Sequence, residues 1–384
     1  MILIKNGHIK TMVSPDMEKG CILLGDDGKI AAIDQNLTAP EGATVIDAEG
    51  RLVTPGCIEA HCHVGLREEA MGWEGNDLNE KTASITPHMR GIDSVRPGDK
   101  HFIRAIQYGI TSAATGPGSS NVVGGTFAAI KLVGNRVDDM IIKDPVAMKA
   151  AFGCNPKGAH GQQRKAMPRT RMGVAAMLRE LLMKTKCYME AKENGKNPAF
   201  DMQLECMIPV LKKEIPLKCH TIRAEDSFTA IRIAREFDID ITLDHVLEGH
   251  NIADQLAQYD YPIIFGPIMN ATQKIESREK NPATAGILCK AGCKVSLSTD
   301  CDVVNLHHLL LTAALCVGDG MPYEEAWKAV TVNPAEALGI ADRVGSLEVG
   351  KDADVVIWTE DPLIYACGRA YTTIVDGKIV WQRA

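Results

Sequence analysis

The sequence lacks any run of about 20 consecutive apolar residues, so no membrane-spanning helix is expected. Its first residues, from Met1 to Gly7, also lack the long apolar core of a signal peptide. Both absences predict a cytoplasmic protein that has no membrane partner.

Positive charge is not concentrated anywhere in the 384-residue chain. The formal net charge is -7, from 42 Lys and Arg residues against 49 Asp and Glu residues, and the basic residues are scattered. This distribution argues against a nucleic-acid partner and favours a small partner that is neutral or cationic. The sequence leaves open whether the protein forms homo-oligomers.

No Cys-x-x-Cys pair of the kind found in small zinc sites is present. The twelve cysteines are spread along the chain, and several lie in apolar runs such as 314–317. We therefore expect free, buried thiols in a reducing compartment.

The middle of the chain alternates short apolar runs with segments of helical spacing. Seven runs are predicted to be parallel strands that helices bury on both faces: 55–64, 109–115, 146–152, 216–220, 239–245, 261–265 and 294–300. An eighth strand is expected at 126–131, a segment that fits a helix or a hairpin beside the barrel equally well. Helices are predicted over 171–192, 227–237 and 322–330. The alternation is typical of a (β/α)8 TIM barrel of roughly 250 residues.

Both chain ends have the pattern of short strands separated by turns. The segment 25–28 and the pair Asp376-Gly377 stand where hairpin turns are expected. We therefore expect residues 1–50 plus 346–384 to form a small composite β-sandwich domain, and residues 51–345 to form the barrel domain.

Two histidines separated by one residue end the first predicted barrel strand. His61 and His63 point to the same face, because side chains of a strand alternate with a period of two. Three later strands end in His220, His245 and Asp300, and a barrel brings the carboxyl ends of its strands to one mouth. The set predicts a site for a divalent transition metal such as zinc, and the structural alternative is a group of core histidines.

The predicted ligands indicate hydrolytic chemistry. A metal held by imidazoles lowers the pKa of a bound water and polarises a carbonyl group. Asp300 is then the candidate general base and acid, which takes the proton of the water and delivers it to a leaving nitrogen. Its alternative role is that of a plain ligand or of an anchor for a histidine.

Several motifs resemble those of one known superfamily. They are Pro55-Gly56 with His61-Cys62-His63, the strand-end His220 and His245, Ser298-Thr299-Asp300, Thr331-Val332-Asn333-Pro334-Ala335, and the segment 345–354. Together they resemble the amidohydrolase superfamily over nearly the whole chain. The segments 72–81 and 115–121 resemble its imidazolonepropionase-related branch.

The resemblance implies a metal-bearing (β/α)8 barrel with a composite β-sandwich. It implies hydrolysis of C–N bonds, and less often of C–O or P–O bonds. By position, it makes His61, His63, His220 and Asp300 the ligands of a primary metal. His245 is then a ligand of a second metal or a catalytic residue that contacts the substrate.

Two positions depart from the family pattern. Cys154 stands where relatives tend to carry glutamate, and Cys301 where they often carry another histidine. A thiolate is a good zinc ligand but a poor substitute for a bridging carboxylate. The sequence therefore leaves open whether Cys154 is a ligand or a packed thiol. It also leaves open whether the site holds one metal or two, and whether the metal is zinc, iron or manganese. A carbamylated bridge could come only from Lys149 or Lys157.

Candidate substrate-binding residues lie in three segments. The irregular loop 66–100 follows the first strand and is predicted to bind substrate through Trp73, His88 and Arg90. Arg164, in a basic loop, could clamp a substrate carboxylate, or it is simply solvated. Arg223, which follows His220 closely in the sequence, is the fifth candidate substrate-binding residue.

The sequence supports three functions. The first is hydrolysis of an amide, cyclic imide or lactam bond in a small molecule. The second is a mononuclear aminohydrolase that releases ammonia from a heterocycle, although the acidic residues it needs next to His220 are displaced by Arg223. The third is a metal-free scaffold, which the intact ligand set argues against.

Overall fold

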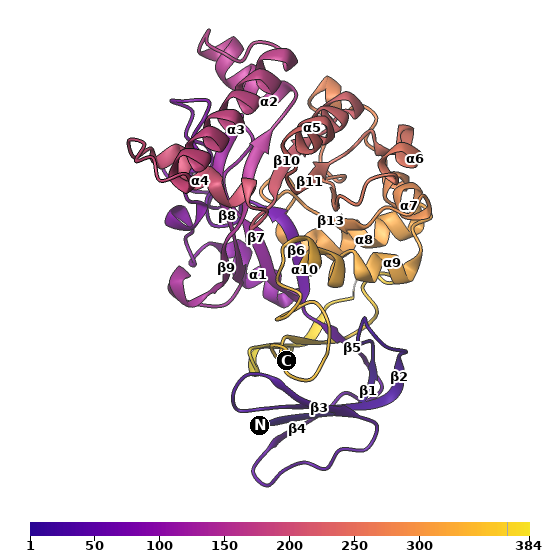
Figure 1. Cartoon of the computed structure of the whole chain (residues 1–384). Coiled ribbons are helices and arrows are strands. Elements are labelled where there is room, and N and C mark those ends of the chain that lie inside the picture. Colours follow the sequence, from indigo (N-terminus) through magenta and orange to yellow (C-terminus); the bar gives the residue numbers. More distant parts are fainter. Residues whose placement is uncertain (367) are drawn as a thin grey trace.

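The chain folds into two eight-stranded sheets, one of which curves into a nearly closed barrel (Figure 1). The computed structural model describes residues 1–366 and 368–384. The barrel strands are β6 (Cys57–Cys62), β7 (Ile110–Thr115), β8 (Val123–Lys131), β9 (Ile141–Ala151), β10 (Leu217–Thr221), β11 (Ile241–His245), β12 (Ile263–Phe265) and β13 (Val295–Leu297). Contacts between β13 and β6 bring the two sheet edges together, and Ser298 Oγ donates to the carbonyl oxygen of His61 at 2.7 Å.

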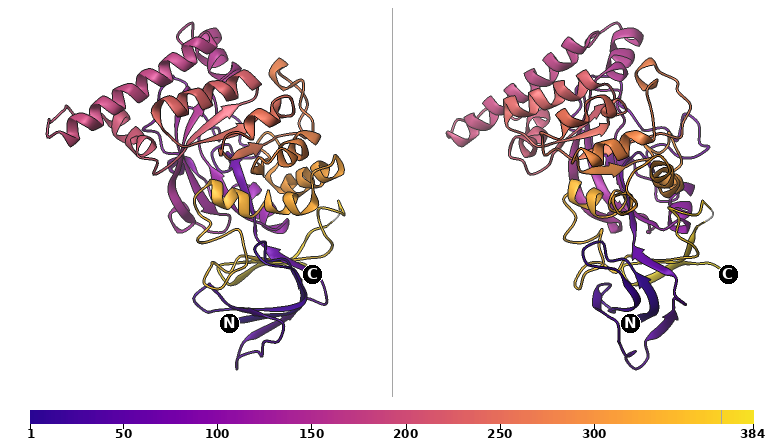
Figure 2. Two further views of the ribbon diagram at one scale, coloured as in Figure 1. Left: turned by 45° about the vertical axis from the view of Figure 1, so that its right-hand side comes forward. Right: turned by 90° about the vertical axis from the view of Figure 1, so that its right-hand side faces the viewer.

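Helices surround the barrel. They are α1 (Lys100–Gln107), α2 (Cys154–Pro156), α3 (Arg171–Glu193), α4 (Met202–Leu211), α5 (Ala224–Phe237), α6 (Ala253–Leu256), α7 (Ala283–Lys290), α8 (Leu309–Gly318), α9 (Tyr323–Lys328) and α10 (Val332–Ala337). The predicted helices correspond to α3, α5 and α9. The long α3 projects from the barrel (Figure 2). Within residues 1–366 and 368–384, no helix has the length and apolar character needed to cross a membrane.

The strand β8 departs from the regular alternation of parallel strands and helices. It is antiparallel to both β7 and β9, whereas the other described neighbours in the barrel sheet are parallel. The connections 116–122 and 132–140 are too short for crossover helices, so the chain reverses in hairpins. The hairpin that the sequence offered as an alternative at 126–131 is therefore present, as part of the barrel sheet itself.

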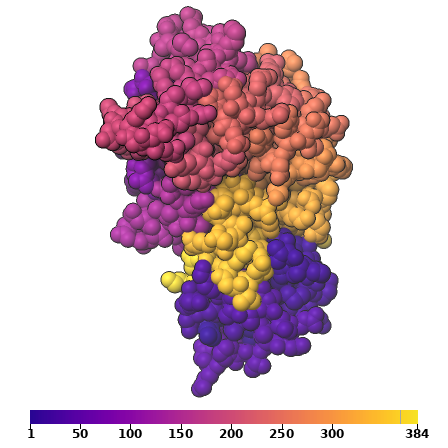
Figure 3. All heavy atoms as spheres, in the orientation of Figure 1, coloured from indigo at the N-terminus to yellow at the C-terminus, as the bar shows by residue number. Residues whose placement is uncertain are grey.

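Strands from both chain ends form the second sheet. Its members are β1 (Ile2–Ile9), β2 (Met17–Leu24), β3 (Ile30–Asp34), β4 (Thr44–Asp47), β5 (Leu52–Pro55), β14 (Val355–Trp358), β15 (Ala370–Val375) and β16 (Lys378–Gln382). β14 pairs with β5, so the last strands extend the sheet of the first ones. Figure 3 shows the yellow C-terminal segment lying against the indigo N-terminal one. The division into domains at residues 50 and 346 stays a prediction.

A cluster of charges, buried except for Asp376, joins this sheet to the barrel. The ammonium group of Lys131, at the end of β8, lies 2.6 Å from Asp354, 3.0 Å from Asp352 and 3.2 Å from Asp376. Burial lowers the pKa of Lys131, but the three carboxylates outweigh burial and raise it overall. Because removal of Lys131 would leave the buried carboxylate of Asp354 without its cationic partner, the cluster fixes the two sheets to each other. This contact accounts for two aspartates of the motif at 345–354.

Candidate active site

The first barrel strand delivers two histidines to the carboxyl end of the barrel. His61 is the fifth residue of β6 and His63 follows the strand, and both side chains are buried. His220 and His245 reach the same place from β10 and β11, and Asp300 from the segment after β13. The five predicted ligands therefore converge, as the barrel topology requires.

The Nδ1 atoms of three of these histidines are held by acceptors. His63 Nδ1 lies 2.7 Å from the carbonyl oxygen of Gly116, and His245 Nδ1 lies 2.8 Å from that of Gly266. His61 Nδ1 lies 2.7 Å from Asp244 Oδ2. A carbonyl or carboxylate oxygen only accepts, so each Nδ1 carries the proton. In the neutral rings, the Nε2 lone pairs therefore face the centre of the site.

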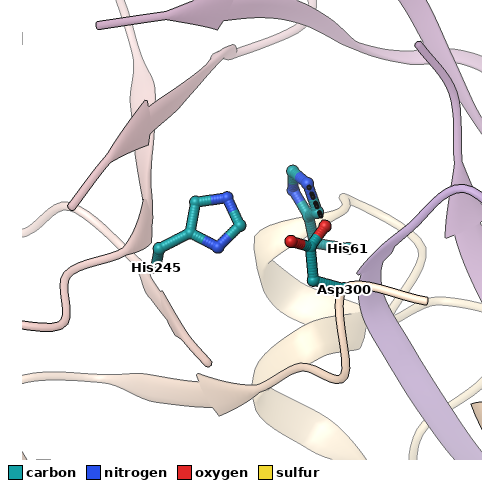
Figure 4. A group of neighbouring side chains, drawn as sticks. All are labelled: His61, His245 and Asp300. Atoms are coloured by element: carbon teal, nitrogen blue, oxygen red, sulfur yellow. Dashed lines mark ion pairs between the residues drawn. The ribbon is translucent and has the colours of Figure 1, made fainter. Parts of the chain in front are cut away.

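The central atoms of the site are acceptors that face one another. Asp300 Oδ1 lies 3.2 Å from His63 Nε2 and 3.6 Å from His61 Nε2. His61, His245 and Asp300 each offer a ligand atom, and these atoms lie within 4.8 Å of one another (Figure 4). Moreover, His245 Nε2 and Asp300 Oδ1 are buried without a hydrogen-bond partner. Lone pairs gathered in this way fit a divalent cation, because burial without a partner is costly.

His220 completes the group from β10. Its ring centroid lies 4.3 Å from that of His245. Its Nδ1 lies 3.0 Å from the hydroxyl oxygen of Ser119, and its Nε2 lies 3.3 Å from the amide nitrogen of Asn155. Ser119, in the turn after β7, therefore orients this ring, a role that the sequence did not reveal.

Burial favours the neutral form of three of the imidazoles, those of His61, His220 and His245. Burial lowers the pKa of His61 and of His220 well below the ordinary value, and the pKa of His245 is lowered for the same reason. For Asp300, burial raises the pKa, but His245 and His63 outweigh burial, and the pKa lies below its usual range. Neutral imidazoles beside an ionised carboxylate are the protonation states that metal ligands need.

Lys149 lies among these ligands. Its side chain is fully buried on β9, and its Nζ lies 3.2 Å from His61 Nε2. Burial lowers its pKa to about 8. A second buried lysine, Lys218 on β10, pairs instead with Asp244 at 3.3 Å. Of the two lysines, Lys149 is therefore the one that faces the ligand atoms.

A buried carboxylate connects the first strand to the segment that carries Asp300. Glu59 accepts hydrogen bonds from the backbone nitrogen of His61 at 3.0 Å and of Thr299 at 2.9 Å, and from the Thr299 hydroxyl at 2.7 Å. Burial raises the pKa of Glu59 to about 7, and the bonds from Thr299 oppose the rise. Glu59 thus holds His61 and the neighbour of Asp300 in one arrangement.

Cys154 lies beside the group but is engaged elsewhere. Its thiol lies 2.7 Å from Glu276 Oε1, and its backbone nitrogen donates to Glu276 Oε2 at 3.1 Å. Burial and Glu276 raise the pKa of Cys154 to about 12. A protonated thiol that donates to a carboxylate is a poor metal ligand. Cys301 is also buried, and its carbonyl oxygen accepts from the backbone nitrogen of His63.

The five candidate metal ligands are called the ligand group below: His61, His63, His220, His245 and Asp300. This group opens into a cavity of about 530 Å³ at the barrel mouth, a size that suits a small molecule. Its lining includes Arg67, Asn79 and Lys81 from the loop 66–100, which was expected to bind substrate. The five predicted substrate-binding side chains do not line it. Trp73 is 90% exposed, His88 and Arg164 lie outside the lining, Arg90 pairs with Asp144, and Arg223 pairs with Glu225.

The residues that sequence reasoning missed share a recognisable signal. Glu59 and Lys218 are single charged residues in buried strands, each two positions before a predicted ligand and hence on the same face. The same signal marks Lys149, which the sequence had already offered as a candidate for a carbamylated bridge, because it is the only charged residue in the run 146–152. A lone charge in a strand that is buried on both faces indicates a partner or a function.

The barrel and its inward-facing histidines and carboxylate define an α/β-barrel hydrolase of the type that uses divalent metals. The chain belongs to the amidohydrolase family, whose model matches residues 52–380. Members of this superfamily bind divalent metals, and the chain is a hydrolase that acts on carbon–nitrogen bonds other than peptide bonds. The predicted superfamily and its imidazolonepropionase-related branch are confirmed.

Individual relatives agree with this assignment. An amidohydrolase of known structure from Thermotoga maritima is 37% identical, with a TM-score of 0.95 and full coverage of both chains. The imidazolonepropionase of Bacillus velezensis is 25% identical over 89% of this chain and 85% of its own. The amidohydrolase tasK of Hapsidospora irregularis is 29% identical over 89% of this chain, which spans only 38% of tasK. A 5-methylcytosine deaminase from Klebsiella pneumoniae, 16% identical with a TM-score of 0.59, shares the fold alone.

Proposed function

We propose that the protein hydrolyses an amide, cyclic imide or lactam bond of a small molecule in a metal-dependent reaction. The observation that carries the proposal is the pair of buried atoms without partners, His245 Nε2 and Asp300 Oδ1, at the base of the cavity. His61, His63, His220, His245 and Asp300 would hold one or two divalent ions, with zinc as the expected metal and iron or manganese as alternatives. When bound, the metal supplies Lewis-acid polarisation of the scissile carbonyl and an activated nucleophile.

Asp300 is the residue to which we assign proton transfer. Its side chain is 14% exposed and lines the cavity, so it can reach both the ligand group and the substrate. Its Oδ1 atom is buried without a hydrogen-bond partner, so the carboxylate is in place to accept the proton of the attacking nucleophile. The same carboxyl then delivers the proton to the leaving nitrogen. His245 lines the cavity beside it and is in place to contact the carbonyl side of the substrate.

Lys149 is the best candidate for a ligand shared by two metals. An ammonium or amine group does not bridge cations, but a carbamate does. A carbamate forms when Nζ, as the neutral amine, bonds to the carbon of CO2, one C=O π bond of CO2 opens to a carboxylate oxygen, and the nitrogen loses one proton to solvent. The place of Nζ, 3.2 Å from His61 Nε2, supports this assignment, and the engaged thiol of Cys154 argues against that residue as the bridge. We therefore favour a site for two metals.

Deamination of a heterocycle is less well supported. That reaction needs an acidic side chain close to the strand-end His220 as a proton shuttle. Arg223 is the N-cap residue that precedes α5 there, and its guanidinium pairs with Glu225 and Glu248. Those two carboxylates lie outside the cavity lining. The alternative of a metal-free scaffold leaves the facing lone pairs without an explanation.

The test is a metal and activity profile of the purified protein. Amides, cyclic imides and lactams are assayed against amino-heterocycles, with ammonia scored separately, and the metal content is measured by mass spectrometry. We expect hydrolysis without ammonia release, and a loss of about 10²-fold or more in kcat for Asp300→Asn. Asp319→Asn, an exposed carboxylate after α8, is the matched control. Ammonia release would favour the deaminase, and absence of bound metal from the active protein would refute the proposal.

A further inference from the structure

The cavity at the barrel mouth has a local charge opposite to that of the whole chain. Its lining contains the basic side chains of Arg67, Lys81 and Lys274 and the acidic ones of Asp300 and Asp302. Arg67 pairs with Asp302 at 2.7 Å, and Asp300 belongs to the ligand group. In the described part of the chain, no ion pair joins Lys81 or Lys274 to a carboxylate. Two positive charges of the lining are therefore available to a ligand.

Lys274 is connected to the ligand group through one amide. Its Nζ donates to Asn155 Oδ1 at 2.5 Å, which orients the amide so that Nδ2 faces His220 Nε2 at 3.3 Å. The ammonium group thus lies two hydrogen bonds and one amide group away from a predicted metal ligand. A molecule that reacts at the ligand group reaches Lys274 with a substituent only a few bonds from the scissile bond.

The position of Lys274 is fixed by its neighbour Glu276. Although Lys274 is exposed, Glu276 is 2% exposed and accepts from both the backbone nitrogen and the thiol of Cys154. These bonds join the loop after β12 to the residue that precedes Asn155. The cysteine at this position therefore anchors the loop that carries the lysine.

We propose that Lys274, positioned by Asn155 and Glu276 and assisted by Lys81, binds a carboxylate of the substrate. This inference rests on the proposed function and names its substrate class: carboxylate-bearing amides of the N-acyl amino acid type. At one end of the cavity, the Lys274 ammonium can donate a charge-assisted hydrogen bond to a carboxylate, and the Asn155 amide beside it can donate a second, neutral one. The other end of the molecule then lies at Asp300 and His245.

The test compares, on the metal-loaded enzyme, N-acetyl amino acids with their carboxamides, in which a neutral group of similar size replaces the carboxylate. For the wild type we expect kcat/KM to be about tenfold or more higher for the carboxylate. Lys274→Met should lower this value about tenfold, mainly through KM, and leave the carboxamide within about twofold. Lys274→Arg should retain part of the preference, and Lys81→Met should give the same split with a smaller loss.

Lys184→Met is the matched control, because Lys184 pairs with Glu180 on the surface of α3 and its removal changes the net charge equally. An equal loss for both substrates in Lys274→Met, or a wild-type preference for the carboxamide, would overturn the inference. If the wild type hydrolyses neither compound, the proposed hydrolysis of N-acyl amino acids fails. Calorimetric titration of N-acetylglycine into the wild type, Lys274→Met and Lys184→Met then tests carboxylate binding by itself. Binding weakened about tenfold in Lys274→Met alone supports it, and equal binding by all three proteins overturns it.

Discussion

The side-chain nitrogen of Lys149 lies 3.2 Å from Nε2 of His61, although 88 residues separate them in the sequence. No carboxylate pairs with Lys149 in the described part of the chain. A buried lysine that has no counter-ion but faces imidazole lone pairs is costly unless it is modified or unprotonated. We therefore predict that Lys149→Met lowers the bound metal from two ions to one and lowers kcat by about 10²-fold or more.

Metal content per chain and native mass spectrometry check this prediction. The wild type should carry the additional mass of one CO2, and the variant should not. Lys149→Ala supplemented with a short carboxylate is the second variant, because a small anion can occupy the space of the missing group and restore the second ion. Two ions bound to Lys149→Met would show that the lysine is not a ligand.

Asp244 should control the metal affinity without contacting the metal. Its Oδ2 accepts from His61 Nδ1 at 2.7 Å, and both side chains are fully buried. Asp244→Asn removes the charge that holds the ring and leaves the ammonium of Lys218 without its partner. We expect the affinity for zinc to fall by about 10- to 100-fold. Competition with a chromophoric chelator measures it, and Asp240→Asn, at the exposed residue that precedes β11, should leave it unchanged.

The fold was largely predictable because its strands are short and buried. The runs that contain His61, His220 and His245 are bounded by turns, and parallel strands buried on both faces have few other arrangements. β8 was ambiguous for a physical reason. Its residues are as apolar as those of a helix core, and only the short connections on either side show that the chain reverses there.

The convergence of the five candidate ligands was predictable because barrel topology brings strand ends together, whereas the cavity wall was not. The positions of Lys81, Asn155 and Lys274 depend on loops without periodicity, and Glu276 fixes Lys274 through a contact with Cys154 across 122 residues. The net charge of -7 favoured a neutral or cationic partner. Local charge in the cavity has the opposite sign, since total charge does not specify how charges are distributed.

The stability of the metal-free protein should fall below neutral pH. Burial lowers the pKa of His61, His220 and His245 from the ordinary value near 6.5, so the unfolded chain binds protons that the folded chain does not. Their contribution is complete above pH 6.5 and is lost as the pH falls below that value. Each histidine adds a loss of up to about 1.4 kcal/mol per pH unit.

Thermal unfolding of the chelator-treated protein between pH 7.5 and 5.5 measures this loss. His220→Asn should show a shallower decline, because one of the three groups no longer titrates. His8→Gln, at a partly exposed histidine of β1, should keep the full decline. A melting temperature that does not change over this range would contradict the burial of neutral imidazoles.

Glu59 should determine where Asp300 lies, although it does not reach the cavity lining. Its two oxygens accept from the backbone nitrogen of His61 and from both donors of Thr299. Glu59→Gln keeps the volume but replaces one acceptor by an NH2 group, which must face an N–H or O–H donor in either orientation. One buried donor is then unsatisfied, at a cost of about 1–3 kcal/mol.

We therefore expect Glu59→Gln to lower the free energy of unfolding by about that amount and to lower kcat more than it raises KM. Thr299→Val removes only the hydroxyl donor and leaves the carboxylate in place, so its effect on kcat should be smaller. Urea unfolding and steady-state kinetics on the same preparations separate the two effects. If Glu59→Gln lost stability but kept the wild-type kcat, Glu59 would support the fold without positioning Asp300.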